Sequence, residues 1–175
     1  MTTPVVTAPY LAEVALIGFA GVAKLARPDT TARALQQARL PATRSAVRVG
    51  AATELLLAVA ALAYPGALTG ALVALSYAAF TLFVAIALQK RWPLSSCGCF
   101  GKPDTAPSKA HAALNAAAAA SAAWWAASSP GSLSRVFSGQ PLQGAPLGLS
   151  AAVIALLAYI VWTNPVPSVT GAGNR

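Results

Sequence analysis

The sequence has few charged residues for its length. Only 9% of its 175 residues are charged, whereas about 25% is usual for a soluble domain. Hydrophobic residues make up 57% of the chain. This composition excludes a disordered chain, which needs low hydrophobicity and a high charge density. It also argues against an ordinary soluble domain and favours a protein whose main solvent is the lipid bilayer.

Acidic residues are especially scarce, because the chain has 12 Lys and Arg but only 4 Asp and Glu. A basic chain can indicate nucleic-acid binding. Here the basic residues cluster in two loops between apolar segments, with no platform of aromatic residues among them. We therefore expect no nucleic-acid partner and interpret the charge as a determinant of membrane topology.

Cysteine is nearly absent, and the two present are Cys97 and Cys99. A disulfide-rich secreted scaffold is therefore excluded. Two cysteines alone also cannot complete a four-ligand zinc or iron–sulfur site.

Five segments are long and apolar enough to cross a bilayer, which takes about 20 residues. Prolines lie at or near their ends and none falls inside a proposed span, so we expect five helices. The Ala-rich fourth segment is the least hydrophobic and depends on its neighbours. The fold class expected is an all-α integral membrane helical bundle. Its parts are an N-terminal tail (1–9), the segments 10–26, 47–64, 67–88 and 110–127, an irregular external loop (128–146), a fifth transmembrane helix (147–163) and a C-terminal tail (164–175).

Basic residues predict the orientation of the chain in the cell membrane. Eleven of the twelve fall on the side of the loops after the first and third segments, and only Arg135 falls on the other. Because positive loops stay in the cytoplasm, we expect the N-terminus outside and the C-terminus and the second basic loop inside. Aromatic side chains are expected at the two interfaces: Trp92 and Trp162 inside, Tyr10, Tyr64, Trp124 and Trp125 outside.

The first basic loop has two interpretations. One is a short surface helix capped by Asp29, with Leu35 and Ala38 toward lipid and Arg33 and Arg39 toward phosphate headgroups. The other is a plain solvated loop.

The sharpest motif is the segment Ser-Ser-Cys-Gly-Cys-Phe-Gly at residues 95–101. A disulfide between Cys97 and Cys99 would close a small, strained ring, and strained disulfides are the labile ones. Nearby Lys90, Arg91 and Lys102 favour the thiolate form. The pair is therefore a candidate catalytic dithiol.

Two other interpretations of the cysteines stay open. Adjacent thiolates bind Cu(I), with His111 as a further ligand, although Met1 is the only methionine and a Met-lined copper path is absent. Alternatively, both cysteines are inert small residues in a turn.

Two carboxylates fall inside the proposed spans. Glu54 lies roughly 10 Å below the cytoplasmic end of the second segment, where a charge costs about 2.5–3.5 kcal/mol. Lys24 is its expected partner, either in a structural pair or as part of a proton carrier beside the dithiol. Glu13 lies about 5 Å from the outer end and is expected to reach the interface.

His111, the only histidine, opens the fourth segment, and Asn115 follows one turn later. A histidine there can assist thiol deprotonation, or it can be merely solvated. Both residues map to the cytoplasmic half, together with Lys24, Glu54 and the cysteines.

Five pieces of the sequence resemble the methylamine utilisation protein MauE family, within the wider DoxX-like group of small membrane proteins. They are residues 23–28, 53–57, 80–83, 96–101 and 108–115, of which Cys-Gly-Cys-Phe-Gly is the specific one. The resemblance covers about residues 10–127 and implies a four-helix DoxX-like core. The fifth transmembrane helix is an addition to this core.

The resemblance further implies a membrane thiol–disulfide oxidoreductase or accessory factor. In methylamine utilisation, this role concerns maturation of the disulfide-rich small subunit of methylamine dehydrogenase, beside a thioredoxin-like partner. Those disulfides form outside the cytoplasm, whereas the charge count places the cysteines inside. To carry electrons across the membrane, the protein would therefore need a movement of the cysteines, a quinone or a partner protein. A further alternative is a scaffold that anchors a partner enzyme through the basic loop 27–48.

Overall fold

The computed structural model describes residues 3–94, 106–128 and 133–164, and every regular element in these ranges is a helix. The all-α class expected from the sequence is confirmed. The elements are α1 (Thr3–Ala26), α2 (Pro28–Gln37), α3 (Arg44–Ala63), α4 (Ala67–Gln89), α5 (Lys109–Ser128), α6 (Leu133–Ser138), the 3-10 helix η1 (Pro141–Gly144) and α7 (Ala145–Thr163).

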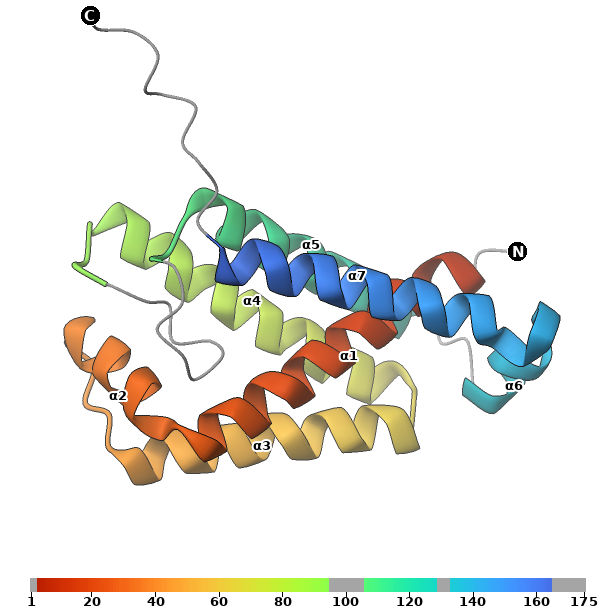
Figure 1. The fold of residues 1–175 in the computed structure, drawn as a ribbon, viewed down its shortest axis with the longest axis horizontal. Helices are drawn as coiled ribbons and strands as arrows, with labels where there is room; N and C mark the ends of the chain where they lie inside the picture. Colours follow the sequence, from red (N-terminus) through yellow and green to blue (C-terminus); the bar gives the residue numbers. More distant parts are fainter. Residues whose placement is uncertain (1–2, 95–105, 129–132, 165–175) are drawn as a thin grey trace, which may run out of the picture.

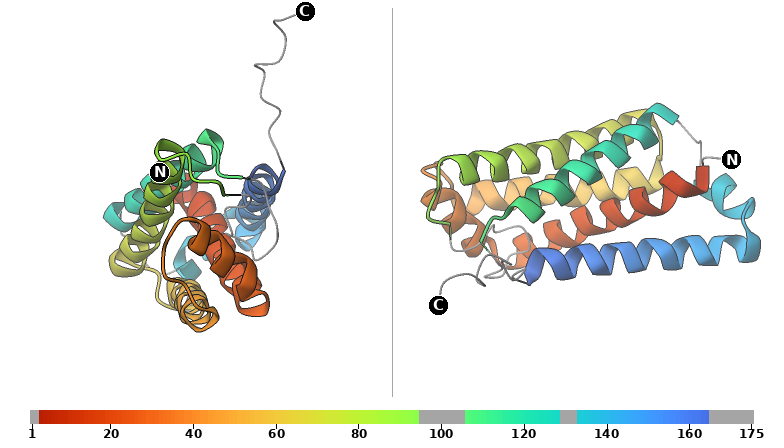
Figure 2. Two further views of the ribbon diagram at one scale, coloured as in Figure 1. Left: turned by 90° about the vertical axis from the view of Figure 1, so that its left-hand side faces the viewer. Right: turned by 90° about the horizontal axis from the view of Figure 1, so that it is seen from above.

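The five long helices α1, α3, α4, α5 and α7 run up and down between the two ends of an elongated bundle (Figure 1). Helix α1 is central and contacts α3, α5 and α7, while α5 packs along α4. The bundle is also seen from above and from one end in Figure 2. One end carries α2, the start of α3 and α5, and the end of α4 and α7; we call it the α2 end. Helix α6 lies at the opposite end.

Four of these helices are long and apolar enough to cross a membrane: Val5–Ala26, Arg44–Ala63, Ala67–Gln89 and Ala145–Thr163. Many of their large apolar side chains point outward, and Leu56, Leu75 and Leu149 are 65–69% exposed on the isolated chain. Such outward leucines suit a lipid surrounding, because lipid tails solvate them without the penalty that water imposes.

The Ala-rich α5 does not reach the hydropathy of the other four helices, but it packs closely against α4. A Cβ atom on Gly70 would lie only 2.9 Å from Trp125 Cδ1 and 3.1 Å from Ala126 Cα. Small residues at such contacts let helix backbones approach and gain packing energy. This contact supplies the support from a neighbour that the composition of α5 requires.

Two boundaries differ from the sequence-based expectation. Helix α1 begins at Thr3, so Pro9 lies inside it rather than at its start. A proline there removes one backbone hydrogen bond in the second turn, which neighbouring helices make tolerable. Within residues 128–146, expected as irregular, the structure has α6 and η1.

The aromatic side chains do not follow the expected interface belts throughout. Tyr10 and Trp125 are fully buried and stack with their ring centroids 4.4 Å apart, and Trp162 is also buried. Tyr64 and Trp124 are exposed at 79% and 60%. Composition alone cannot separate these cases, because a tryptophan at a helix end serves equally as a packing residue or an interface residue.

The first basic loop contains the helix α2, but its details differ from the expectation. Arg27 is the N-cap, and Asp29 lies in the first turn, where it forms an ion pair with Arg44 instead of capping the helix. Part of its apolar side packs on the bundle: Ala32 and Ala34 are buried, and the C-cap Ala38 is buried in a cluster with Ala87 and Leu94.

Candidate functional site

The α2 end contains a buried ion pair between α1 and α3. Lys24 Nζ lies 2.6 Å from Oε1 and 2.8 Å from Oε2 of Glu54. The side chains are only 7% and 17% exposed, and the ammonium lies 5.1 Å from the ring centre of Phe80. The pairing expected from the sequence is therefore present. Charges so far from water are tolerated only when they are paired in good geometry.

A glycine one turn before Lys24 brings the two helices together. A Cβ atom on Gly21 would lie 2.8 Å from Ala51 O and 3.0 Å from Leu55 N. Real side chains do not approach backbone atoms that closely, so only glycine permits this crossing of α1 over α3. The short separation lets the Lys24 and Glu54 side chains meet directly.

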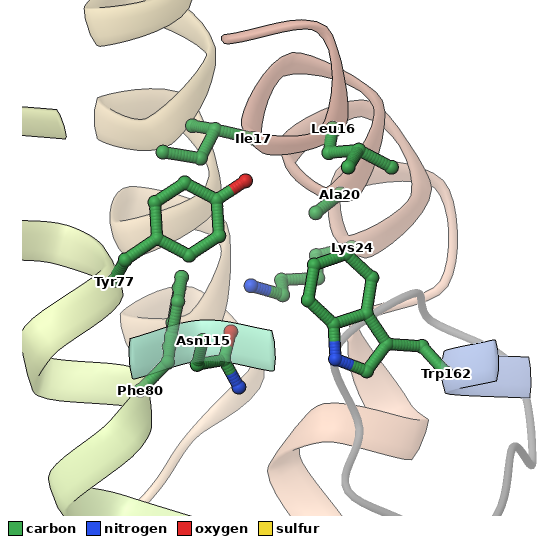
Figure 3. Close-up of a pocket in the computed structure, with 8 residues that line it drawn as sticks. All are labelled: Leu16, Ile17, Ala20, Lys24, Tyr77, Phe80, Asn115 and Trp162. Carbon is green, nitrogen blue, oxygen red and sulfur yellow. The ribbon is translucent and has the colours of Figure 1, made fainter. Parts of the chain in front are cut away.

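A small cavity of about 30 Å³ lies beside the pair, inside the bundle. Its lining includes Lys24, Asn115, Tyr77 and Trp162, and Figure 3 shows the Lys24 ammonium and the Asn115 carboxamide close together among apolar side chains. A space of this size holds about one water molecule when polar partners are present. Asn115 is only 4% exposed, so α5 brings a polar group into the interior beside Lys24.

His111 is also buried, at 3% exposure, and both ring nitrogens are engaged. Nε2 lies 3.1 Å from the main-chain oxygen of Trp162, and Nδ1 lies 2.6 Å from Ser108 Oγ. A carbonyl oxygen can only accept, so Nε2 carries the proton and donates it. His111 thereby ties the start of α5 to the end of α7. The solvated histidine considered from the sequence is excluded by this burial.

Cys97 and Cys99 lie outside the described residues, but the chain on either side of them is placed. Leu94 is buried against Ala38 and Ala87, and Ser108 contacts His111. Both flanks belong to the α2 end, where α4 ends and α5 begins, and Lys24 lies two residues before the end of α1 at the same end. Within the part of the chain that the structure describes, no group of three His, Cys, Asp or Glu residues could hold a metal ion.

Glu13 is a buried polar residue whose position the sequence-based expectation missed. It is 6% exposed instead of reaching the interface. Its Oε2 atom, the Tyr10 hydroxyl and Trp125 Nε1 are buried without a hydrogen-bond partner among the described residues. Helical spacing in the sequence could have indicated this burial. Tyr10, Glu13 and Ile17 fall on one face of α1, and that face packs into the core.

These features define a class of protein: a multi-pass membrane protein built as a helical bundle, with a buried ion pair near one end. The model of the family described as methylamine utilisation protein MauE matches residues 2–128, which run from the start of α1 to the end of α5. The chain belongs to this family. In comparisons with curated proteins and with solved structures, nothing matches the chain. Helix α7 lies outside the matched residues.

Proposed function

We propose that the protein is an integral membrane thiol–disulfide redox component in which Cys97 and Cys99 form the redox pair. In each cycle, the disulfide of Cys97 and Cys99 takes two electrons and two protons from the dithiol of a thioredoxin-like partner, which becomes a disulfide. The two thiols then pass two electrons and two protons to an oxidant, for which a quinone is the candidate, as their sulfurs join again. This cycle supports disulfide formation in a maturing partner protein, such as methylamine dehydrogenase in methylamine utilisation.

The observation that carries the proposal is the distance along the chain between the cysteines and the α2 end. Cys97 follows the buried Leu94 by three residues, and three residues of chain span at most about 11 Å. This short tether to Leu94 supports a place for the redox pair at the α2 end.

The charge of the α2 end supports the same role. The acidic residues Asp29 and Glu54 are both engaged in ion pairs there. Nine basic residues lie at the same end: Lys24, Arg27, Arg33, Arg39, Arg44, Arg48, Lys90, Arg91 and Lys109. Positive surroundings stabilise thiolates, and the thiolate is the form that attacks a disulfide.

Four residues have supporting roles in the proposal. Glu54 supplies an acceptor for a proton that the thiols release, and Lys24 holds the Glu54 carboxylate in place. His111 contacts Ser108, which precedes α5, and the end of α7, and Asn115 supplies a polar group beside Lys24.

The proposed orientation places the α2 end in the cytoplasm and α6 outside the cell membrane. Its support is the distribution of charge over the two ends, because Arg135 in α6 is the one basic residue at the opposite end among the residues that the structure describes. Basic loops remain in the cytoplasm during insertion.

Thiol titration and trapping of a mixed disulfide test the redox role. Purified protein is equilibrated in dithiol buffers of graded potential, and free thiols are counted by mass after alkylation. We expect a two-thiol transition between the reduced and oxidised forms. In cells, Cys97→Ser or Cys99→Ser leaves one attacking thiol, which should accumulate a mixed disulfide with a thioredoxin-like protein.

The double variant Cys97→Ser/Cys99→Ser is the matched control, because it should trap nothing and leave partner disulfides unformed. Normal partner disulfides in this variant would contradict the redox proposal and favour the scaffold. Copper binding has less support, because His111 would have to release a hydrogen bond to act as a ligand.

A further inference from the structure

A second, larger cavity opens between α3 and α4 at the α2 end. Its volume is about 340 Å³, which lies in the range of small-molecule sites. We call it the α3–α4 cavity; its walls include Leu35 from α2, Gly50 and Glu54 from α3, Phe80 and Phe83 from α4, and Lys24 from α1. Helix α2 and the residues that follow it contribute Thr31, Leu35, Pro41 and Ala42 to the lining.

The chemistry of the walls restricts the occupant. Apart from Lys24, Glu54 and Thr31, all of the lining residues are apolar. Phe80 and Phe83 lie one helical turn apart on the same face of α4, and both line the cavity. Aromatic side chains favour packing with another planar ring. The ion pair is neutral overall, so a charged ligand gains little there. A planar, uncharged and mostly apolar molecule fits best.

Lys24 can also donate to such a ligand. An ammonium group has three protons, and the two contacts with Glu54 use at most two of them. Lys24 is 6% exposed, so a further hydrogen bond from it would be made away from water. A hydrogen bond from a charged donor to a carbonyl oxygen is stronger than one between neutral groups. The complementary ligand therefore carries a carbonyl on its ring.

The cavity is accessible from the side of the bundle. Gly50 and Ala46 line it, yet both are exposed on the outer surface of α3. A Cβ atom on Gly50 would meet no atom within 4 Å, which confirms the open space at this point. In a membrane, this opening faces lipid, so a molecule dissolved in the bilayer can enter.

We propose that the α3–α4 cavity binds a quinone, with its ring between Phe80 and Phe83 on one side and α3 on the other and a carbonyl oxygen accepting from Lys24. This inference rests on the proposed function, since a dithiol that is oxidised repeatedly in a membrane needs a two-electron acceptor. The two thiols lose two electrons and two protons while their sulfur–sulfur bond forms. The quinone gains both and leaves as a hydroquinone.

Gly50→Leu is the decisive variant for the binding site. The leucine side chain has room to fill the cavity, and the helical conformation of Gly50 suits leucine better than glycine. Gly148→Leu in α7 is its matched control, because a Cβ there also meets nothing within 4 Å but lies outside the cavity. The probe is a decyl-tailed benzoquinone with a photoreactive azide, applied to protein in nanodiscs.

We expect labelled peptides from α3 and α4 in the wild type and in Gly148→Leu, and loss of this labelling in Gly50→Leu. Labelling that survives in Gly50→Leu, or that falls only on the outer lipid-facing surface, would overturn the quinone site. Excess unlabelled decyl-benzoquinone should compete for the labelling. Competition by phospholipid alone would instead identify the occupant as a lipid chain and also overturn the proposal.

A second readout separates the site from the proposed redox pair. Reduced protein is mixed with the quinone without oxygen, and hydroquinone and free thiols are measured. We expect one hydroquinone formed for two thiols lost, at least about tenfold slower in Gly50→Leu. Cys97→Ser/Cys99→Ser should form no hydroquinone but should still be labelled. Labelling of the wild type without oxidation of its thiols would contradict the redox function alone. Thiol oxidation at the normal rate in Gly50→Leu would contradict the quinone site alone.

Discussion

Lys24 Nζ contacts both carboxylate oxygens of Glu54, at 2.6 and 2.8 Å, in the interior of the bundle. Removing one partner leaves the other charge buried without compensation, which costs about 3–5 kcal/mol for buried pairs. We therefore expect Glu54→Leu to lower the melting temperature of the protein in nanodiscs markedly. Thermal unfolding followed by circular dichroism measures the effect.

The double variant Lys24→Met/Glu54→Leu is the control for this prediction. It removes both charges and keeps apolar side chains of similar size, so its stability should return close to that of the wild type. If the double variant is as unstable as Glu54→Leu, the loss arises from packing, and the ion-pair interpretation is wrong.

Replacing Glu13 by leucine should change the stability in the opposite direction to Glu54→Leu. Glu13 is 6% exposed, and its carboxyl has a side-chain hydrogen bond with Ser121, but Oε2 has no partner among the described residues. Burial of an unpaired polar atom costs about 1–3 kcal/mol. Glu13→Leu should therefore raise stability by a similar amount. The Tyr77 hydroxyl donates to the main-chain oxygen of Glu13, so this bond survives the substitution. A lower melting temperature for Glu13→Leu would show that the hydrogen bond with Ser121 outweighs the cost of burying Oε2, and would contradict the prediction.

The α1–α3 contact gives a prediction about packing. Gly21→Ala places a methyl group 2.8 Å from Ala51 O, so the helices must separate, at a cost of about 1–3 kcal/mol. Gly50→Ala is the matched control in α3, where a Cβ meets nothing and alanine favours the helix by up to about 1 kcal/mol. Thermal unfolding of both variants should show opposite shifts. Equal stability of the two would contradict the close crossing.

The sequence alone was enough to predict the features that follow from the pattern of residue types along the chain. Apolar length predicted the long helices, and the shortage of intramembrane charges left Lys24 as the obvious partner for Glu54. The family was identified from short motifs around Cys97 and Cys99, and the match over residues 2–128 confirms it.

The features that the sequence missed depend on which face of a helix meets another helix. Tyr10, Glu13 and Trp125 are near the ends of the segments expected from the sequence, where interface and core positions have the same composition, and only the packing of the helices shows that they are buried. The inward-facing side of α2 has the same origin, because an amphipathic helix can cover lipid or protein equally well. The chemistry of the cysteines stays a prediction.

The orientation of the bundle is open to direct labelling, because Cys97 and Cys99 are the only cysteines. A membrane-impermeant maleimide should label them only after cells are permeabilised and treated with reductant. As a reporter for the other end, Ser138→Cys in a chain that also carries Cys97→Ser and Cys99→Ser places one thiol on the exposed surface of α6. This thiol should be labelled in intact cells. Labelling of the native cysteines in intact cells, with protection of the α6 reporter, would reverse the topology. The dithiol would then face the compartment where exported disulfides form, and the partner would be a periplasmic or extracellular thioredoxin-like protein instead of a cytoplasmic one.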